Sequence, residues 1–193
     1  SVVPAVNEAL KFAVKKILKL ELCLVGPGVK TGLNIKIDNP AQLGADLVVG
    51  GVAAVAKYPL PCIIFDMGTA NTISVINGRG EFLGGTISAG MGISLDALAS
   101  KTAQLPYIDL ENPEEIIGTN TVSSMKSGLI YGTAAMMDGM ADRIEEVLGQ
   151  KATLVATGGR AASVIRFCKR DFVLNSDLLL EGLNIIYNKN RGN

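Results

Sequence analysis

Residues 62–87 constrain the fold most strongly, because an uninterrupted apolar run is followed by two turn signals. Cys62–Phe65 is short and fully apolar, which is typical of a central strand buried on both faces of a sheet. Further strands are predicted at residues 72–76 and 81–87, and residues 77–80 between them have the sequence of a hairpin turn. The segment is therefore predicted to form a three-stranded meander.

Helices are predicted on both sides of this meander from the spacing of apolar residues. They cover residues 6–17, 41–58, 93–101, 123–148, 161–168 and 178–188. Two more apolar runs, at residues 22–25 and 153–156, are predicted to be buried strands. This order of strands and helices predicts an α/β fold.

The composition excludes several classes of function. The 193 residues include no His, which rules out His-based triads, His metal ligands and imidazole proton shuttles. The formal net charge is zero, so we expect neither nucleic acid nor an acidic membrane surface as a partner. Cys23, Cys62 and Cys168 are far apart, and we interpret them as reduced, packed thiols of a cytoplasmic protein. The longest nearly apolar run, Val48–Ala56, is too short to span a membrane.

Asp66 follows the predicted central strand and is the first candidate for a functional residue. Gly68 permits a turn with close backbone approach, and Thr69 adds a hydroxyl and backbone N–H groups aimed at the same point. A carboxylate, a glycine turn and a hydroxyl together suit a nucleotide phosphate with its cation. An ordinary β-hairpin with an aspartate in its turn explains the same residues equally well.

Three other segments have both a structural and a functional interpretation. Asp46, near the start of the helix at 41–58, is either a cap or the general base for a substrate hydroxyl. The bend at Gly158-Gly159 either holds a nucleotide against the backbone or is a tight turn. The polar residues of Gly118–Thr121 either cap the helix that follows or contact a ligand.

Together these segments resemble the type III pantothenate kinase family over essentially the whole chain. The matching runs are Val25–Asn34, Asp38–Pro40, Gly44–Asp46, Asp66–Ala70, Gly84-Gly85, Gly118–Thr121, Thr157–Gly159 and Leu180–Leu183, in the order and spacing of the family. The joint occurrence of the motifs carries the resemblance, since no single motif is decisive.

The resemblance implies a fold of two ribonuclease-H-like halves, as in the acetate and sugar kinase, Hsc70 and actin superfamily. Residues 1–61 would be the C-terminal part of the first half, and residues 62–193 the second half. It also implies a cytoplasmic homodimer that uses ATP, Mg²⁺ and a monovalent cation, K⁺ or NH₄⁺. The implied reaction is phosphorylation of pantothenate to 4'-phosphopantothenate, the first step of coenzyme A synthesis.

The resemblance also assigns roles to individual residues. Asp46 would accept the proton of the pantothenate hydroxyl. Asp66 would hold the monovalent cation. The pantothenate pocket would be lined by Gly44, Ala45, Asp46, Leu47 and Thr121, and ATP would be bound by Gly68, Thr69, Gly158 and Gly159. Phosphoryl transfer needs positioning and charge neutralisation more than a strong nucleophile, so the absence of His is no obstacle.

Three departures from the family pattern leave alternatives open. The family begins with a strand that carries an Asp and a phosphate-binding loop, and we expect this element to precede Ser1. Leu47 stands where the family commonly has Arg, and Ile37 where it commonly has Tyr. A non-catalytic, kinase-like regulator, an inactive fragment or another kinase or phosphatase of the superfamily would fit these departures.

Overall fold

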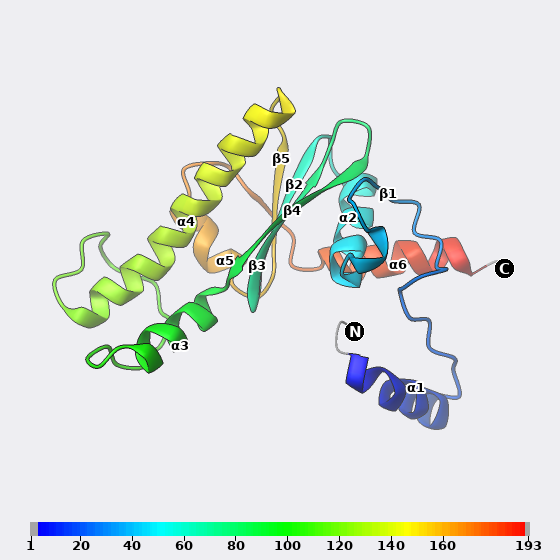
Figure 1. The fold of residues 1–193 in the computed structure, drawn as a ribbon, viewed down its shortest axis with the longest axis horizontal. Coiled ribbons are helices and arrows are strands. Elements are labelled where there is room, and N and C mark those ends of the chain that lie inside the picture. Colours follow the sequence, from blue (N-terminus) through cyan, green and yellow to red (C-terminus); the bar gives the residue numbers. More distant parts are fainter. Residues whose placement is uncertain (1–3, 192–193) are drawn as a thin grey trace.

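Strand β2 (Cys62–Met67) lies inside a six-stranded mixed sheet, and the two faces of the sheet carry different helices (Figure 1). The structure is a computed structural model that describes residues 4–191. The other strands are β1 (Asn34–Ile35), β3 (Ala70–Ile76), β4 (Glu81–Ala89), β5 (Thr153–Thr157) and β6 (Val173–Leu174). Their order is β1-β4-β3-β2-β5-β6, in which β2 runs antiparallel to β3 and parallel to β5.

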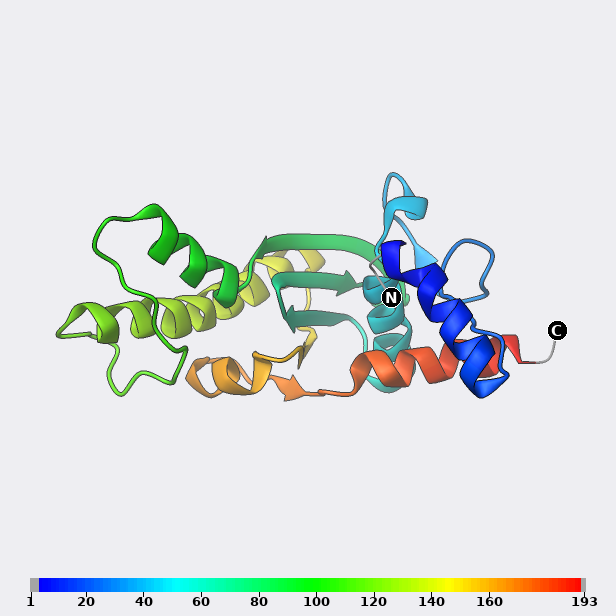
Figure 2. The ribbon, with the colours of Figure 1, turned by 90° about the horizontal axis from the view of Figure 1, so that it is seen from below.

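Helices cover both faces of this sheet, which confirms the predicted α/β class (Figure 2). The helices are α1 (Pro4–Leu18), α2 (Ala45–Lys57), α3 (Met91–Lys101), α4 (Thr121–Leu148), α5 (Ala161–Val164) and α6 (Leu178–Asn190), with 3-10 turns at Pro40–Gln42 and Ile165–Phe167. Helices α4 and α5 pack on one face, and α2 and α6 pack on the other. Among the helices described, none has both the length and the apolar character needed to cross a bilayer.

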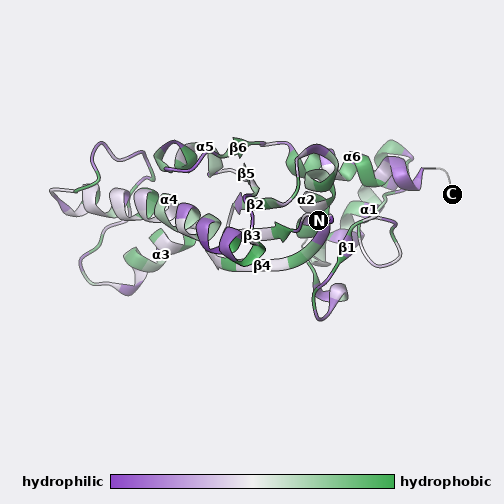
Figure 3. Ribbon diagram, turned by 90° about the horizontal axis from the view of Figure 1, so that it is seen from above, coloured by the Kyte–Doolittle hydropathy of each residue, from purple (hydrophilic) through white to green (hydrophobic). Residues whose placement is uncertain are grey.

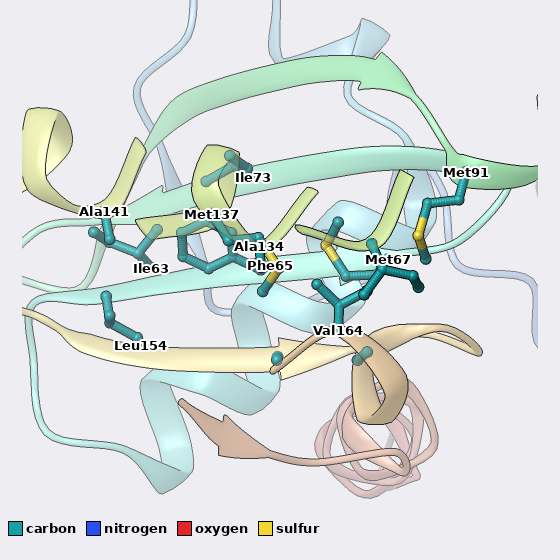
Figure 4. Close-up of a cluster of buried hydrophobic side chains, with 13 residues drawn as sticks. Ile63, Phe65, Met67, Ile73, Met91, Ala134, Met137, Ala141, Leu154 and Val164 are labelled. Atoms are coloured by element: carbon teal, nitrogen blue, oxygen red, sulfur yellow. The ribbon is translucent and has the colours of Figure 1, made fainter. Parts of the chain in front are cut away.

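Alternation along β2 places its side chains in two core clusters, one on each face of the sheet. Ile63, Phe65 and Met67 point toward α4 and α5, as the close-up in Figure 4 shows. The side chains of Cys62 and Ile64 pack on the opposite face with α2 and α6. Figure 3 shows the hydrophobic residues concentrated in these strands and in α2. Because side chains of β2 pack in both clusters, the C-terminal end of the strand is held by contacts on both faces of the sheet.

Helix α4 is capped at both ends, and its end at Leu148 before Gly149 is as predicted, whereas its start differs. Asn120 caps it: its side chain accepts a hydrogen bond from the Ser123 backbone N–H at 2.9 Å, and the two residues form a capping box. The helix consequently begins at Thr121, two residues earlier than predicted. It ends before Gly149, which adopts the left-handed conformation at φ 67° as a helix C-terminus commonly does.

The predicted strand at residues 22–25 is wrong. These residues are irregular and lie beside α2 and α6, where they line a pocket away from the sheet. An apolar run becomes a strand only where a neighbouring strand offers hydrogen bonds, and the edge position beside β4 is taken by β1 instead. The prediction for Cys23 is also wrong, because this residue is exposed, whereas Cys62 is buried.

Smaller corrections concern element ends and two short strands. Strands β1 and β6 were not predicted, since two residues are too few to show any alternation. The helix predicted at residues 161–168 is a short α-helix followed by a 3-10 turn. The helix predicted from residue 41 begins at Ala45, because a separate 3-10 turn capped by Asn39 precedes it.

Helices α2 and α6 pack with almost no space between their backbones. Gly182 of α6 lies against the backbone of α2, so that an added Cβ would lie 2.1 Å from the Val49 carbonyl oxygen. Real Cβ atoms do not approach other atoms so closely, and only glycine permits this contact. The contact fixes the helix that carries Asp46 in its first turn.

A buried ion-pair network joins the last turns of α4 to the segments after it. Glu145 is 5% exposed, and its carboxylate accepts hydrogen bonds from Arg170 at 2.8 Å, Lys151 at 2.7 Å and the Ala152 N–H at 3.0 Å. Burial by itself would raise the pKa of Glu145, but these hydrogen bonds and the charge of Arg170 lower it to about 2. The network therefore stabilises the fold only while Glu145 is ionised.

We expect Glu145→Gln to lower the free energy of unfolding at neutral pH by roughly 1–3 kcal/mol. Because the folded-state pKa is depressed, this contribution is present above the ordinary pKa of glutamate and is lost between about pH 5 and about pH 2. Urea unfolding at pH 7 and pH 3 measures it. Glu146→Gln, at the exposed neighbouring position, is the control; equal losses in both variants at pH 7 would contradict the prediction.

Candidate functional site

Asp66 belongs to a row of polar side chains across the sheet. It is paired with Thr72 on β3 and with Thr157 on β5. Directly paired residues point to the same face, and this face is the one covered by α2, since Ile64 lies on it too. The carboxylate of Asp66 is therefore flanked by two threonines near the ends of β2 and β5.

Two glycines make room for the Asp66 carboxylate. A Cβ at Gly158 would lie 2.4 Å from Asp66 Oδ1 and 2.7 Å from the Met67 nitrogen, and Gly158 has φ +90°, where side chains are rarely accommodated. A Cβ at Gly68 would lie 3.6 Å from the same oxygen. The Arg160 N–H also donates to the Met67 carbonyl at 3.1 Å. The Asp66 turn and the Gly158 bend thus form one unit.

The environment of Asp66 favours its neutral form. Burial is the main cause that raises the pKa of Asp66, and the negative charge of Asp46 adds to it. Within residues 4–191, no group donates a hydrogen bond to this carboxylate. A carboxylate that is partly buried, unpaired and near a second carboxylate is suited to a cation, and hard cations prefer such oxygen ligands.

Asp46 lies in the first turn of α2 and faces the same region. Its Oδ1 accepts a hydrogen bond from the Leu47 N–H at 2.9 Å, which fixes the carboxylate at the helix N-terminus. Gly44 precedes the helix, and a Cβ there would lie 2.4 Å from that oxygen. Two carboxylates from different elements, Asp46 from α2 and Asp66 from β2, are thereby close enough for the charge of one to affect the pKa of the other.

A pocket of about 530 Å³ opens beside Asp46. Its lining comes from the loop before α2, the first turn of α2 and the ends of β3 and β4, and consists of Ile37, Asp38, Asn39, Gln42, Leu43, Gly44, Asp46, Leu47, Ala70, Thr72 and Ile87. We call it the acceptor pocket. Of the predicted substrate-binding residues, Gly44, Asp46 and Leu47 line it, whereas Ala45 lines two neighbouring pockets.

The predicted nucleotide-binding residues lie at the turns around Asp66. Thr69 is exposed, and its carbonyl accepts a hydrogen bond from the Gly90 N–H at 3.1 Å, which fixes the turn. Gly159 is exposed, with open space where a side chain would project. A ligand can therefore approach the backbone of both turns from solvent.

Thr121 is not near the other predicted residues. It is the first residue of α4, is exposed, and does not line the acceptor pocket. Figure 1 shows the first turns of α4 beside α3, on the other side of the sheet from α2. Within a single chain, Asn120 caps the helix together with Ser123, so the structural interpretation of Gly118–Thr121 holds for Asn120.

Sequence reasoning missed several residues of the acceptor pocket. Ile87 of β4 reaches it because it is paired with Thr72, which is itself paired with Asp66. The alternation of side chains along the predicted meander could have placed Thr72 on the same face as Asp66. Leu43 and Gln42 carried no such signal, because they lie in an irregular segment and its short 3-10 turn.

A solved structure confirms that this arrangement of elements occurs elsewhere. A protein described as a Baf family transcriptional activator from Campylobacter jejuni superposes with a TM-score of 0.62, covering 97% of this chain and 81% of that one. The sequences are 19% identical, so the likeness concerns the fold.

Sequence comparisons identify the family, which the structural likeness does not. The family model described as type III pantothenate kinase matches residues 1–143. Type III pantothenate kinases from Solibacter usitatus and Koribacter versatilis are each 42% identical, covering 98% and 100% of this chain and 73% and 70% of their own lengths. The enzyme of that name from Halalkalibacterium halodurans is 40% identical over 190 residues. This chain therefore belongs to the type III pantothenate kinase family.

Proposed function

We propose that this chain transfers a phosphoryl group from ATP to the hydroxyl of pantothenate, the first step of coenzyme A synthesis in the cytoplasm. The observation that carries the proposal is the pair Asp46 and Asp66, which come from different elements and are close enough for the charge of Asp46 to raise the pKa of Asp66, while Asp46 also lines the acceptor pocket. The relatives' shared name supplies the substrate. In this pair, the Asp46 carboxylate faces the hydroxyl of the acceptor, and the Asp66 carboxylate faces the cation and the phosphates of the nucleotide.

Asp46 is the proton acceptor in this proposal. Its Oδ1 is held by the Leu47 N–H, so the other carboxylate oxygen remains for a substrate hydroxyl in the acceptor pocket. A general base of this kind contributes ~10²–10⁴ in rate. Leu47, Leu43 and Ile87 offer apolar contacts that hold the acceptor in position.

The nucleotide lies along the turns at Gly68-Thr69 and Gly158-Gly159, whose backbones are open to a phosphate. The Asp66 carboxylate fits a monovalent cation, K⁺ or NH₄⁺, because its oxygens are unpaired in the described residues and the threonines beside it add hydroxyl oxygens. No group of three metal-binding side chains occurs within residues 4–191. Mg²⁺ held with the nucleotide would neutralise charge on the phosphates.

A homodimer gives Thr121 a place in this proposal. Within one chain it is remote from Asp46, so it would line an acceptor pocket only from a second copy. The exposed face of α4 supports such a contact: at Gly128, Gly132 and Gly139 the space beyond the backbone is open. We also propose that residues 1–61 and 62–193 belong to two ribonuclease-H-like halves, with the nucleotide between them.

The direct test is ATP-dependent phosphorylation of pantothenate by this 193-residue chain, with Mg²⁺ and K⁺ present. Turnover that requires Asp46 supports the proposal. No phosphopantothenate at any cation concentration would contradict it.

We expect Asp66→Asn to remove the stimulation by K⁺ and to raise the melting temperature at neutral pH. The pKa of Asp66 is raised in the folded state, so its ionised form costs stability above that pKa, and a neutral amide avoids this cost. Activity against K⁺ concentration and thermal unfolding measure the two effects. Unchanged K⁺ dependence in Asp66→Asn would exclude Asp66 as the cation ligand.

Because the pKa of Asp66 is raised, K⁺ stimulation of the unmodified chain should weaken on acidification at a higher pH than an ordinary aspartate would give.

A further inference from the structure

Asn71 is a buried amide that the proposed reaction does not use. It is the second residue of β3, and its side chain is 4% exposed. It is paired with Met67 of β2, whose side chain packs in the cluster with α4 and α5 (Figure 4). Directly paired residues point to the same face of a sheet, so Asn71 lies on the face opposite to Asp66. Any part that it has in the reaction is therefore indirect.

The two polar atoms of the Asn71 amide differ in their partners. The Nδ2 group donates a hydrogen bond to the Ala89 carbonyl oxygen at 3.2 Å. The Oδ1 atom is buried and accepts no hydrogen bond from any group of residues 4–191. An unpaired buried acceptor destabilises a fold, and an apolar side chain would avoid that cost. Stability alone therefore does not account for an asparagine at this position.

The hydrogen bond from Asn71 fixes the peptide group between Ala89 and Gly90. The oxygen of this peptide group accepts the hydrogen bond from Asn71, and its N–H donates to the Thr69 carbonyl oxygen at 3.1 Å. Gly90 also packs directly on the turn, since an added Cβ would overlap the carbonyl oxygens of Gly68 and Thr69. One peptide group thus connects the Asn71 side chain to the turn at Gly68-Thr69.

We propose that Asn71 is a positioning residue for the nucleotide: it orients the Ala89–Gly90 peptide group and thereby holds the Gly68-Thr69 turn in the conformation that receives the phosphates. This inference rests on the proposed function, which places the nucleotide at that turn. Thr69 is exposed, and the hydrogen-bonded peptide group supports the turn from behind. Groups that are fixed before a ligand arrives bind it without a further cost of ordering.

Asn71→Val tests the proposal because it removes the donor and the unpaired acceptor together, and valine suits a strand. We expect the melting temperature to stay equal or to rise, since the unpaired oxygen is gone and Ala89 is exposed, so that water can solvate its carbonyl. The Kd for Mg·ATP and the KM for ATP should rise roughly tenfold, with the KM for pantothenate unchanged. A merely structural role predicts a lower melting temperature and weaker binding of both substrates.

Two further variants separate positioning from packing. Asn71→Ala removes the same polar groups without adding volume, and it decides the question if valine overpacks the site. Asn188→Ala makes the same change at an exposed position of α6 and should leave the melting temperature, the Kd and both KM values unchanged.

Hydrogen exchange measures the positioning without any substrate. The Gly90 N–H, which donates to Thr69, should exchange roughly tenfold faster in Asn71→Ala than in the unmodified chain, whereas amides of the β2–β3 ladder should not change. Unchanged exchange at Gly90, or an unchanged Kd for Mg·ATP, would overturn the inference.

The two proposals fail in different ways. Phosphorylation of pantothenate with a KM for ATP that does not respond to Asn71→Ala would overturn the inference and leave the kinase function standing. Binding of Mg·ATP that weakens in Asn71→Ala, without phosphorylation of pantothenate by the unmodified chain, would contradict the kinase function and support the inference. If the unmodified chain binds no Mg·ATP, both are overturned, because the turn then receives no nucleotide.

Discussion

Asp46→Asn is expected to lower kcat by ~10²–10⁴-fold while leaving the free energy of unfolding nearly unchanged. The amide oxygen of asparagine still accepts the Leu47 N–H, so the first turn of α2 keeps its hydrogen bond. Loss of the favourable charge at the helix N-terminus is offset by relief of the repulsion with Asp66. Steady-state phosphorylation of pantothenate and urea unfolding measure the two effects.

The control for this variant is Asp96→Asn, which makes the same change of charge on the exposed side of α3. It should retain normal turnover and stability. A second expected effect of Asp46→Asn is a fall in the pKa of Asp66, since the charge of Asp46 helps to raise it. Near-normal turnover in Asp46→Asn would exclude this residue as the base.

Gly182→Ala is expected to be strongly destabilising, lowering the free energy of unfolding by about 1–3 kcal/mol or more. The added Cβ would lie 2.1 Å from the Val49 carbonyl oxygen, so α2 and α6 must move apart. Because α2 carries Asp46, the variant should also lose activity before it unfolds. Activity and unfolding measured along one urea titration would show the order of the two losses.

The same substitution has the opposite expected sign where the space is open. Gly92 lies in α3 with no atom within 4 Å of an added Cβ, and Gly92→Ala should change stability by between zero and about +1 kcal/mol. Equal destabilisation by both variants would mean that loss of glycine, and not the contact with Val49, sets the effect.

The central strands could be predicted from sequence because their signal is local. The apolar run of Cys62–Phe65 was enough to predict its strand, and the turn residues at 77–80 were enough to predict the hairpin. The predictions that failed concern segments whose conformation depends on strands distant in the sequence. Residues 22–25 are as apolar as a strand, yet no strand of the described chain runs beside them. Strands β1 and β6 exist because β4 and β5 offer them hydrogen bonds.

The site was predictable as separate residues and not as an assembly. Asp46 and Asp66 were each singled out from local sequence, with a cap and a hairpin turn as the alternatives. What joins them is the packing of α2 against β2 and α6, which local sequence does not specify. Thr121 shows the converse: the family pattern includes it, but the fold of one chain places it elsewhere.

The contact between α2 and α6 joins residues separated by more than half of the chain. Such a contact closes a long loop, and the entropy of closure delays it relative to local hairpins and helices. During synthesis, Asp46 is made early, but the helix that fixes it is made last. The hairpin of β2 and β3 can form long before that, so the Asp66 end of the site should be organised first. Loss of α6 would then leave the Asp66 turn organised and Asp46 without a fixed position.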